Sequence, residues 1–467
     1  MDKSNISEFT QGDLVIEQGL GWPAGTLRCL REAFVAGRRR EDPWDLAQGP
    51  EGRQQAMAQA AAVFRRGVVV NNAAPSGYRR AQISLAGSVA ATLADLTDPK
   101  AGALGSEASG AVRFLFVVDE AIARLWPEFS GLDSQFPVWV LRGGEAVKNL
   151  ETASSLTVWI RTRLGSQTAG GKAIRGTRVV AVGGGVTLDV AGFAAGLCGL
   201  EHVNIPTTLL AMVDAAIGGK TGVNFPPFGK NQVGLFHFPA RVVICPEFLK
   251  TLPPEEMRAG AAECLKHALL ANDMNLFETW VQLARDGNTA VMEDCGPVLA
   301  VARMKEAFVD RDPFERSGAR EMLNLGHTTA HALESLAQSR GQVVRHGAAV
   351  ALGLGCKAEL MAATQPESAS AARKIMAGLK ASHCLDEIEN WFSGLGTPFD
   401  ALWPSMIEQM RQDKKLRVSD SSGIRIVGLR WNSAINGLET HAMEVEPETL
   451  RRAFVRSLNP EAIDPVY

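Results

Sequence analysis

The chain has 467 residues, of which 46% are hydrophobic and 21% charged, proportions typical of a globular protein with two or three domains. Its net charge of −3 argues against a nucleic-acid-binding protein, which usually carries a basic excess. Seven scattered cysteines without a C-x-x-C pair argue against a disulfide framework and favour a reducing cytoplasm. Because neither a signal-like start nor a long uncharged apolar run occurs, we expect no secretory signal and no membrane span.

Residues 1–66 read as a polar, helical N-terminal extension, and the apolar run after Arg66 resembles the first strand of a new unit. Two stretches rich in Gly, Ala and Ser, 84–91 and 101–111, are typical of loops or surface helices. Nearly continuous apolar runs then predict four strands, at residues 112–118, 136–141, 178–182 and 241–245. Because helical stretches separate these runs, they indicate an α/β domain over residues 67–252, whose parallel sheet is covered on both faces.

After Leu252 the pattern changes to helical periods. It predicts helices at residues 254–285, 297–312, 320–338, 346–364, 367–394 and 403–412, with one strand-like run at 423–429. We therefore predict that a mostly α-helical domain over residues 253–467 follows the α/β domain.

A triple-glycine turn, Gly183-Gly184-Gly185, follows the predicted strand 178–182 and opens a helix that continues to about Gly196. Glycines in such a turn let the backbone approach a pyrophosphate, and a helix N-terminus favours anions. The turn lacks the G-x-G-x-x-G fingerprint, so taken alone it is equally well explained as a plain tight turn. Upstream, Glu145 and Lys148 are spaced i, i+3, and alone they are better explained as a surface ion pair.

Four polar residues step by 4, 3 and 4 along the predicted helix 320–338, and on one helix they would form a single stripe. Their apolar neighbours predict partial burial, and unpaired buried polar groups are costly. The stripe therefore indicates a binding site rather than a core; its members are Arg320, Asn324, His327 and His331.

A carboxylate and a lysine interrupt another apolar helix, because Glu263, Lys266 and His267 are spaced i, i+3, i+4. Glu263 with two histidines would make an N/N/O ligand set, which suits Zn²⁺ with an open coordination position. His346 begins a further apolar helix and is the natural third ligand. Histidine pairs at i, i+4, such as the one that begins at His327, are common without a metal.

The stretch Gly218–Thr221 resembles the end of a phosphate-binding loop. That motif requires a glycine where Asp214 stands, so the sequence argues against nucleotide hydrolysis. Lysines such as Lys220 and Lys230 are individually better explained as surface residues.

In their order and spacing, these motifs together resemble 3-dehydroquinate synthase and the wider sugar phosphate cyclase family over about residues 112–455. The motifs that carry the resemblance lie at residues 143–148, 183–189, 205–214, 218–224, 229–231, 248–252, 262–266, 323–328 and 413–415. The resemblance implies an NAD-binding α/β domain with a Rossmann-like parallel sheet, followed by a mostly α-helical domain that binds metal and substrate.

The resemblance also assigns site residues. It implies NAD contacts from Glu145, Lys148, Gly184, Gly185, Asp189, Thr207, Thr208, Lys230, Thr251 and Leu252. It implies that Zn²⁺ (or Co²⁺) is held by Glu263, His327 and His346. It implies a substrate site formed by Asp214, Lys220, Asn231, Lys266, Lys305, Arg320, Asn324, His331 and Lys414 or Lys415.

The implied enzyme is a carbon–oxygen lyase that converts 3-deoxy-arabino-heptulosonate 7-phosphate to 3-dehydroquinate plus phosphate. The implied steps are transient oxidation by NAD, phosphate elimination, return of the hydride, ring opening and aldol closure. Its expected setting is the shikimate pathway of aromatic amino acid biosynthesis, in a cytoplasmic homodimer that binds a small phosphorylated sugar and neither nucleic acid nor membrane.

Four departures from the family pattern bear on the substrate. No Arg or Lys occurs between Arg178 and Lys220, where family members carry a phosphate-contacting Arg that His202 could replace only in part. One residue is inserted at 225–228 and another at 312–315, and Ala348 stands where the family often has Glu. These changes leave open another heptulose phosphate such as sedoheptulose 7-phosphate, a metal- and NAD-dependent polyol dehydrogenase, and a non-enzymatic binding protein.

Overall fold

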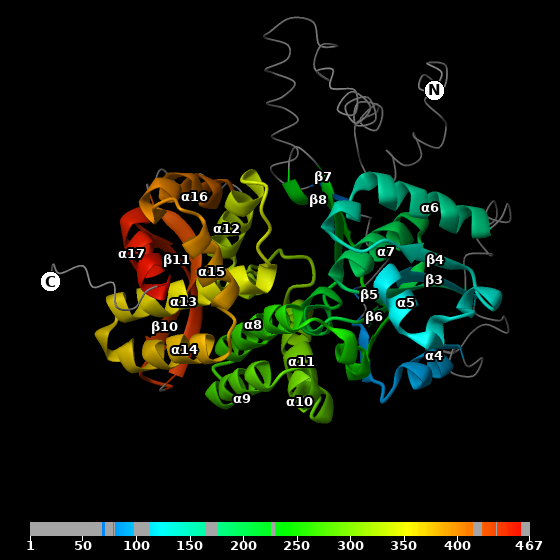
Figure 1. The fold of residues 1–467 in the computed structure, drawn as a ribbon, viewed down its shortest axis with the longest axis horizontal. Helices are drawn as coiled ribbons and strands as arrows, with labels where there is room; N and C mark the ends of the chain where they lie inside the picture. Colours follow the sequence, from blue (N-terminus) through cyan, green and yellow to red (C-terminus); the bar gives the residue numbers. More distant parts are fainter. Residues whose placement is uncertain are drawn as a thin grey trace, which may run out of the picture.

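The computed structural model describes residues 68–70, 78, 80–97, 113–164, 176–225, 229–413, 423–435 and 437–458. The predicted N-terminal extension 1–66, the stretch 101–111, and both Lys414 and Lys415 lie outside the described residues. In the view of Figure 1, a sheet with its helices lies on one side, and helices α12 (His327–Ser339) to α17 (Pro447–Leu458) lie on the other.

The main sheet has six parallel strands and confirms the predicted α/β architecture. In spatial order the strands are β2 (Gln82–Leu85), β9 (Arg241–Ile244), β6 (Glu201–Pro206), β5 (Thr177–Gly183), β3 (Arg113–Asp119) and β4 (Val138–Leu141). The central strands β3 and β5 are almost wholly buried, as their continuous apolar sequences require in a sheet covered on both faces.

The strand order creates a switch point at the carboxyl ends of β3 and β5. The chain leaves β3 through helix α5 (Glu120–Leu125) to β4, then returns through α6 (Leu150–Leu164) to β5 on the other side of β3. Helix α7 (Gly185–Cys198) follows β5 and packs on the sheet. Open α/β sheets bind ligands in the crevice outside the strands' carboxyl ends at such a point, where Asp119 and the triple glycine lie here.

Two strands of this sheet were not predicted. The prediction of loops or surface helices at residues 84–91 is wrong for Ser84 and Leu85 and agrees with the helix that begins at Val89. Ser84 and Leu85 complete β2, which pairs with β9, and helix α4 (Val89–Thr97) begins shortly after. Strand β6 begins with Glu201 and His202, so its apolar run is too short to stand out. A second sheet joins β1 (Val68–Val70) to the hairpin β7 (Lys220–Phe225) and β8 (Gly229–Phe236).

The second half is mostly helical, as predicted. Two predicted helices are each split in two, the first into α8 (Pro254–Leu270) and α9 (Met274–Asp286), the second into α14 (Ala369–Ala381) and α15 (Asp386–Gly394). The predicted strand β10 (Ile424–Asn432) has an unpredicted antiparallel partner, β11 (Gly437–Val445). The remaining helices are α10 (Asn288–Glu293), α11 (Gly296–Arg311), α13 (His346–Thr364) and α16 (Phe399–Asp413). None of the described helices combines the length and apolarity needed to cross a membrane.

The prediction of one continuous helix over residues 320–338 is wrong. A 3-10 helix, η9 (Ala319–Asn324), is followed by a break at Leu325 and Gly326, and α12 begins only at His327. Gly326 has a φ of 81°, a left-handed conformation that side chains other than glycine disfavour. Arg320 and Asn324 therefore do not share a helix face with His327 and His331.

Helix α13 touches the backbones of both α8 and the turn before α12. A Cβ added to Gly347 would lie 1.9 Å from the carbonyl oxygen of Ala259 on α8. A Cβ added to Gly353 would lie 2.1 Å from the carbonyl oxygen of Gly326. Glycines at these two positions bring together, at backbone contact, the three elements that carry Glu263, His327 and His346.

Candidate active site

Three side chains from separate elements converge on one point: Glu263 from α8, His327 from the start of α12 and His346 from the start of α13. Their candidate ligand atoms all lie within 4.8 Å of one another. Glu263 Oε1 is 3.4 Å from His346 Nε2 and 3.6 Å from His327 Nε2. These separations are close to the roughly 3.3–3.5 Å expected between ligands of a tetrahedral Zn²⁺ with bonds of about 2.0–2.2 Å.

The two imidazoles are oriented by acceptors on their other ring nitrogen. His327 Nδ1 is 3.2 Å from the carbonyl oxygen of Leu325, and His346 Nδ1 is 3.3 Å from Glu334 Oε2. Metal-binding histidines usually have such an acceptor, because it fixes the tautomer and leaves the other nitrogen free to bind. The other oxygen of Glu334 is 3.2 Å from Lys230 Nζ.

The electrostatics of this cluster favour a bound cation. Burial alone would raise the pKa of Glu263, but Lys266, 2.5 Å away, and the two imidazoles hold that pKa well below its ordinary value. Burial would lower the pKa of His346, but the Glu263 and Glu334 carboxylates raise it to about 10. A fully buried Glu263 Oε1 that accepts no hydrogen bond from the described residues fits a divalent metal ion.

The predicted substrate residue His331 lies beside the metal cluster. Its ring centroid is 5.5 Å from that of His327 and 6.2 Å from that of His346. His267, on the other hand, turns into the core, where its Nδ1 is 2.8 Å from the carbonyl oxygen of Glu263. Burial lowers the pKa of His267 to about 4, so it is neutral near pH 7.

A second group of charges joins the metal cluster to the sheet. Asp214 lies in a π-helical turn, η7 (Ala211–Ala215), a type of irregularity that is frequent at functional sites. Its carboxylate is 2.6 Å from Lys305 Nζ. Despite burial, Lys305 lowers the pKa of Asp214 below its ordinary value, with further contributions that involve Lys266 and Glu263. The ion pairs at Asp214 and Glu263 therefore lie in one continuous electrostatic network.

Lys220 and Arg320 meet at Glu315. Lys220 forms an ion pair with Glu315, and Arg320 Nε lies 3.7 Å from the same carboxylate. Arg320 is buried and donates to the carbonyl oxygens of Pro313 and Gly218. Because backbone carbonyl oxygens accept hydrogen bonds from its guanidinium nitrogens, Arg320 connects the segment 312–315, which contains one of the two insertions, to the turn before β7.

The buried carboxylate of Asp312 stabilises the segment that begins at this residue. Asp312 Oδ1 and Oδ2 accept backbone hydrogen bonds from Arg316, Ser317 and Arg320. Burial alone would raise the pKa of Asp312, but these donors lower it to about 2. Asn324, at the end of η9, is exposed to solvent.

The predicted dinucleotide residues lie around the switch point. Gly184 caps α7, and the backbone N–H of Thr207 donates to the carbonyl oxygen of Gly183 at 3.0 Å. Cβ atoms added to Gly184 and Gly185 would lie 3.3 Å from Thr208 Cγ2 and Ala215 Cβ, respectively. The two glycines therefore allow the start of α7 to pack closely against Thr208 and Ala215, and the turn lies at a helix N-terminus, where a pyrophosphate would be favoured.

Lys148 pairs with Asp189, not with Glu145 as the i, i+3 spacing suggested. The distance is 2.6 Å and the lysine is buried. Glu145 instead accepts a 2.7 Å hydrogen bond from Asn224 Nδ2 on β7. Asn224 Oδ1 in turn accepts the backbone N–H of Asn231, whose φ of 53° is left-handed.

Thr251 and Leu252 follow the last strand of the main sheet. Thr251 Oγ1 accepts a hydrogen bond from Trp126 Nε1 at 3.2 Å, and the carbonyl oxygen of Leu252 accepts one from Asn288. The role of Thr251 and Leu252 in NAD binding stays a prediction.

Sequence reasoning missed three residues that the geometry places in the site: Asp119, Glu315 and Glu334. Asp119 ends β3 at the switch point, and its Oδ2 accepts a hydrogen bond from Thr187 of α7 at 3.3 Å. A carboxylate directly after a buried strand was the available signal. For Glu334 the signal was its spacing, three residues after His331 and seven after His327, on one helix face.

The structure excludes His202 as a substitute for the missing phosphate-contacting arginine. His202 has no exposed surface, stacks on His237 with ring centroids 4.7 Å apart, and has no hydrogen-bond partner on either ring nitrogen among the described residues. Burial, and then the neighbouring His237, keep its pKa well below 6.5.

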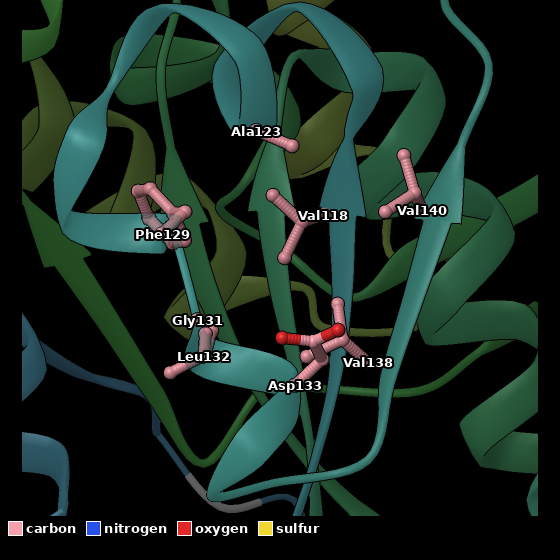
Figure 2. A pocket seen from close by; sticks show the side chains of 8 residues that line it. All are labelled: Val118, Ala123, Phe129, Gly131, Leu132, Asp133, Val138 and Val140. Atoms are coloured by element: carbon pink, nitrogen blue, oxygen red, sulfur yellow. The ribbon is translucent and has the colours of Figure 1, made fainter.

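A separate apolar hollow lies at the sheet edge, between β3, β4 and α5 (Figure 2). It has a volume of about 280 Å³, and Asp133 is the only charged residue that lines it. None of the predicted site residues contributes to it, so it is distinct from the candidate active site.

Comparison with known proteins agrees with this geometry. Two family models match adjacent parts of the chain: "3-dehydroquinate synthase N-terminal" at residues 138–259 and "3-dehydroquinate synthase C-terminal" at residues 260–416. A 3-dehydroquinate synthase of Xylella fastidiosa is 33% identical over 76% of this chain and 83% of its own length. One of Thermosynechococcus vestitus is 47% identical, over 42% of this chain and about half of its own length, 54%.

Solved structures share the fold. A 2-epi-5-epi-valiolone synthase from Streptomyces hygroscopicus with NAD⁺ and Zn²⁺ bound has a TM-score of 0.59 at 21% identity, over 82% of this chain and 98% of that one. A 2-deoxy-scyllo-inosose synthase with carbaglucose-6-phosphate, NAD⁺ and Co²⁺ also has a TM-score of 0.59, at 22% identity, over 80% and 95% of the two chains.

Proposed function

Because the chain belongs to the 3-dehydroquinate synthase family of phosphate-eliminating cyclases, we propose that it converts 3-deoxy-arabino-heptulosonate 7-phosphate to 3-dehydroquinate, with NAD and Zn²⁺ or Co²⁺ as cofactors. The observation that carries the proposal is the convergence of Glu263, His327 and His346. In both imidazoles, an acceptor oxygen near Nδ1 fixes the orientation of the ring. This ligand set leaves room for a substrate oxygen on the metal.

When bound, NAD would take up and return a hydride, and the metal would polarise substrate oxygens. The chain's own residues would position the reactants. The bare backbone at Gly184 and Gly185 would bind the pyrophosphate, with Asp119 beside it. Lys220 and Lys305 would neutralise substrate anions, and His331, beside the metal cluster, would assist at the leaving phosphate.

A turnover assay tests the proposal. Purified protein with NAD and Zn²⁺ should release inorganic phosphate from the heptulosonate phosphate, without net accumulation of NADH because the hydride is returned. Net NADH from an alcohol substrate would instead favour a polyol dehydrogenase. Absence of phosphate release from both this substrate and sedoheptulose 7-phosphate would contradict the cyclase function.

Sedoheptulose 7-phosphate is the second candidate substrate, and the altered phosphate side favours testing it. The segment between Arg178 and Lys220 contains no Arg or Lys, and His202 is buried. Product identification by mass spectrometry, from a panel of seven-carbon sugar phosphates, separates the two substrates. A homodimer, a cytoplasmic location and a place in the shikimate pathway stay predictions; light scattering on purified protein would test the dimer.

A further inference from the structure

Arg345, the residue directly before His346, connects the start of α13 to two other helices. Its Nε lies 2.8 Å from Glu256 Oε1 and its Nη2 lies 3.4 Å from Glu255 Oε1, both in the first turn of α8. On α15, Glu387 accepts the backbone N–H of Arg345 at 2.8 Å and lies 3.2 Å from its Nη1. Arg345 is therefore fixed through its backbone as well as through its side chain.

The residue after His346 is fixed in a different way. Gly347 lies against the backbone of α8, where an added Cβ would be 1.9 Å from the carbonyl oxygen of Ala259. His346 thus stands between two residues that both contact α8, Arg345 through ion pairs and Gly347 through close packing.

These contacts follow one face of α8. Glu256, Ala259 and Glu263 are spaced i, i+3 and i+7, so they lie on successive turns of the same helix face. The start of α13 runs along this face, with Arg345 at the first turn and His346 Nε2 3.4 Å from Glu263 Oε1. The ion pairs of Arg345 therefore determine how far α13 is shifted along α8, and with it the separation of two candidate metal ligands.

The ion pairs of Arg345 affect local geometry more than folding stability. The side chain is 36% exposed, so each pair contributes little to the stability of the fold. A guanidinium, however, carries its N–H donors in one rigid plane, and carboxylates from two helices fix that plane. Among the described residues, no other cation pairs with Glu255, Glu256 or Glu387, so without Arg345 their mutual repulsion would push α8 and α15 apart.

We propose that Arg345 is a positioning residue for the metal ion: by fixing the start of α13 on α8 and α15, it presets the distance between His346 and Glu263. The inference rests on the metal site of the proposed function and is independent of the sugar. Because Arg345 acts through His346, its loss should weaken metal binding although all three candidate ligands remain.

Competition with a chelator for Zn²⁺, measured on the full chain, tests this role without turnover. Arg345→Leu should raise the dissociation constant about tenfold, the lower end of the range for residues that support a metal ligand. Arg345→Lys keeps the charge and should restore part of the affinity. Arg451→Leu is the matched control, because Arg451 also pairs with two carboxylates, those of Asp400 and Glu448, and lies on α17, which carries none of the candidate ligands.

The Co²⁺ form provides a second measurement, since the visible absorption of Co²⁺ depends on its coordination geometry. At saturating Co²⁺ the bands of Arg345→Leu should shift or weaken, because His346 then approaches the ion from a displaced helix start. A change in folding stability alone, which thermal melting measures, would leave these bands as they are. If Arg345→Leu does not fold, Glu387→Ala gives the same test, since it removes the acceptor of the Arg345 backbone N–H.

An unchanged Zn²⁺ affinity or an unchanged Co²⁺ spectrum in Arg345→Leu would overturn the positioning role, and so would an equal loss of affinity in Arg451→Leu. If metal binding responds as expected but no heptulose phosphate is turned over, the proposed function fails and the positioning role stands. If turnover occurs and metal binding in Arg345→Leu matches the wild type, the proposed function stands and the positioning role fails.

Discussion

The metal cluster (Glu263, His327 and His346) and the polar cavity lined by residues 315–318, Glu321, Asn324 and Arg425 are built in opposite ways. At the cluster, Glu263 is fully buried, and an acceptor behind each imidazole fixes its orientation. At the cavity, the charges are partly exposed and neutralise one another in pairs, as Glu321 and Arg425 do. Buried charges need fixed partners, whereas exposed charges can exchange a protein partner for a ligand.

This difference separates chemistry from specificity. A preoriented ligand set can serve any substrate that brings an oxygen to the metal. The partly exposed ion pairs of the cavity, by contrast, can change by single substitutions without disturbing the core. The chain keeps the candidate metal ligands but lacks the phosphate-contacting Arg of the family. This combination fits an enzyme whose reaction class is fixed more firmly than its substrate.

Substitution of a candidate metal ligand should have the largest effect on metal binding and activity. Glu263→Gln removes the only carboxylate ligand and leaves the buried Lys266 without its ion-pair partner. We expect loss of bound metal and a decrease in kcat/KM of more than about a thousandfold, because several kcal/mol of stabilisation depend on the metal. Elemental analysis and a phosphate-release assay measure both; the exposed Glu278→Gln is the control, and a metal-loaded, active Glu263→Gln protein would refute the ligand assignment.

Loss of the support behind a ligand should have a smaller effect. In Glu334→Ala, His346 loses the acceptor on Nδ1, so the metal dissociation constant should rise about tenfold to a hundredfold. Glu334→Gln keeps an acceptor oxygen and should lie between this variant and the wild type. Competition with a chelator measures the affinity, with Glu278→Ala as control. Unchanged metal affinity in Glu334→Ala would mean that the contact with Glu334 does not orient His346 for metal binding.

The buried His202 should make the free energy of unfolding depend on pH. Burial and His237 keep the pKa of His202 well below 6.5 in the folded state, so only the unfolded chain takes up a proton near that pH. The contribution of His202 to the free energy of unfolding should be constant above about pH 6.5 and decrease below it by up to about 1.4 kcal/mol per pH unit. Urea unfolding from pH 8 to pH 5 measures this slope.

His202→Leu should reduce the slope below pH 6.5, while the remainder comes from the buried His267 and His327, whose pKa values burial also lowers. The surface variant His383→Asn should retain the full slope. An identical slope in His202→Leu and the wild type would show that other groups cause the loss of stability.

The sheet was readable from the sequence where burial acts on both faces. Strands β3 and β5 are continuous apolar runs because helices or further core cover them. Strand β6 was not predicted because its first residues are polar. They are accommodated by pairing with β5 and by stacking of His202 on His237, which no local sequence pattern reveals. The break at Gly326 was not predicted either, because its contact with Gly353 on α13 joins residues that are far apart in sequence.

In the candidate site, sequence reasoning named Glu263, His327 and His346, which the structure brings together, and their role as metal ligands stays a prediction. The predicted stripe of Arg320, Asn324, His327 and His331 is not a single helix face, because Arg320 and Asn324 precede the break. Glu334 was not named because its contact with His346, 12 residues away, belongs to the tertiary structure. Its spacing after His327 and His331 on one helix face was the available signal in the sequence.

The glycine contacts of α13 have a mechanical consequence. Backbones that already touch at Gly347 and Gly353 cannot slide past one another without collision. We therefore expect α8, α12 and α13 to move as one block in any opening of the site, with the bend outside these three helices. A metal ion held by Glu263, His327 and His346 would keep its three ligands during such a movement.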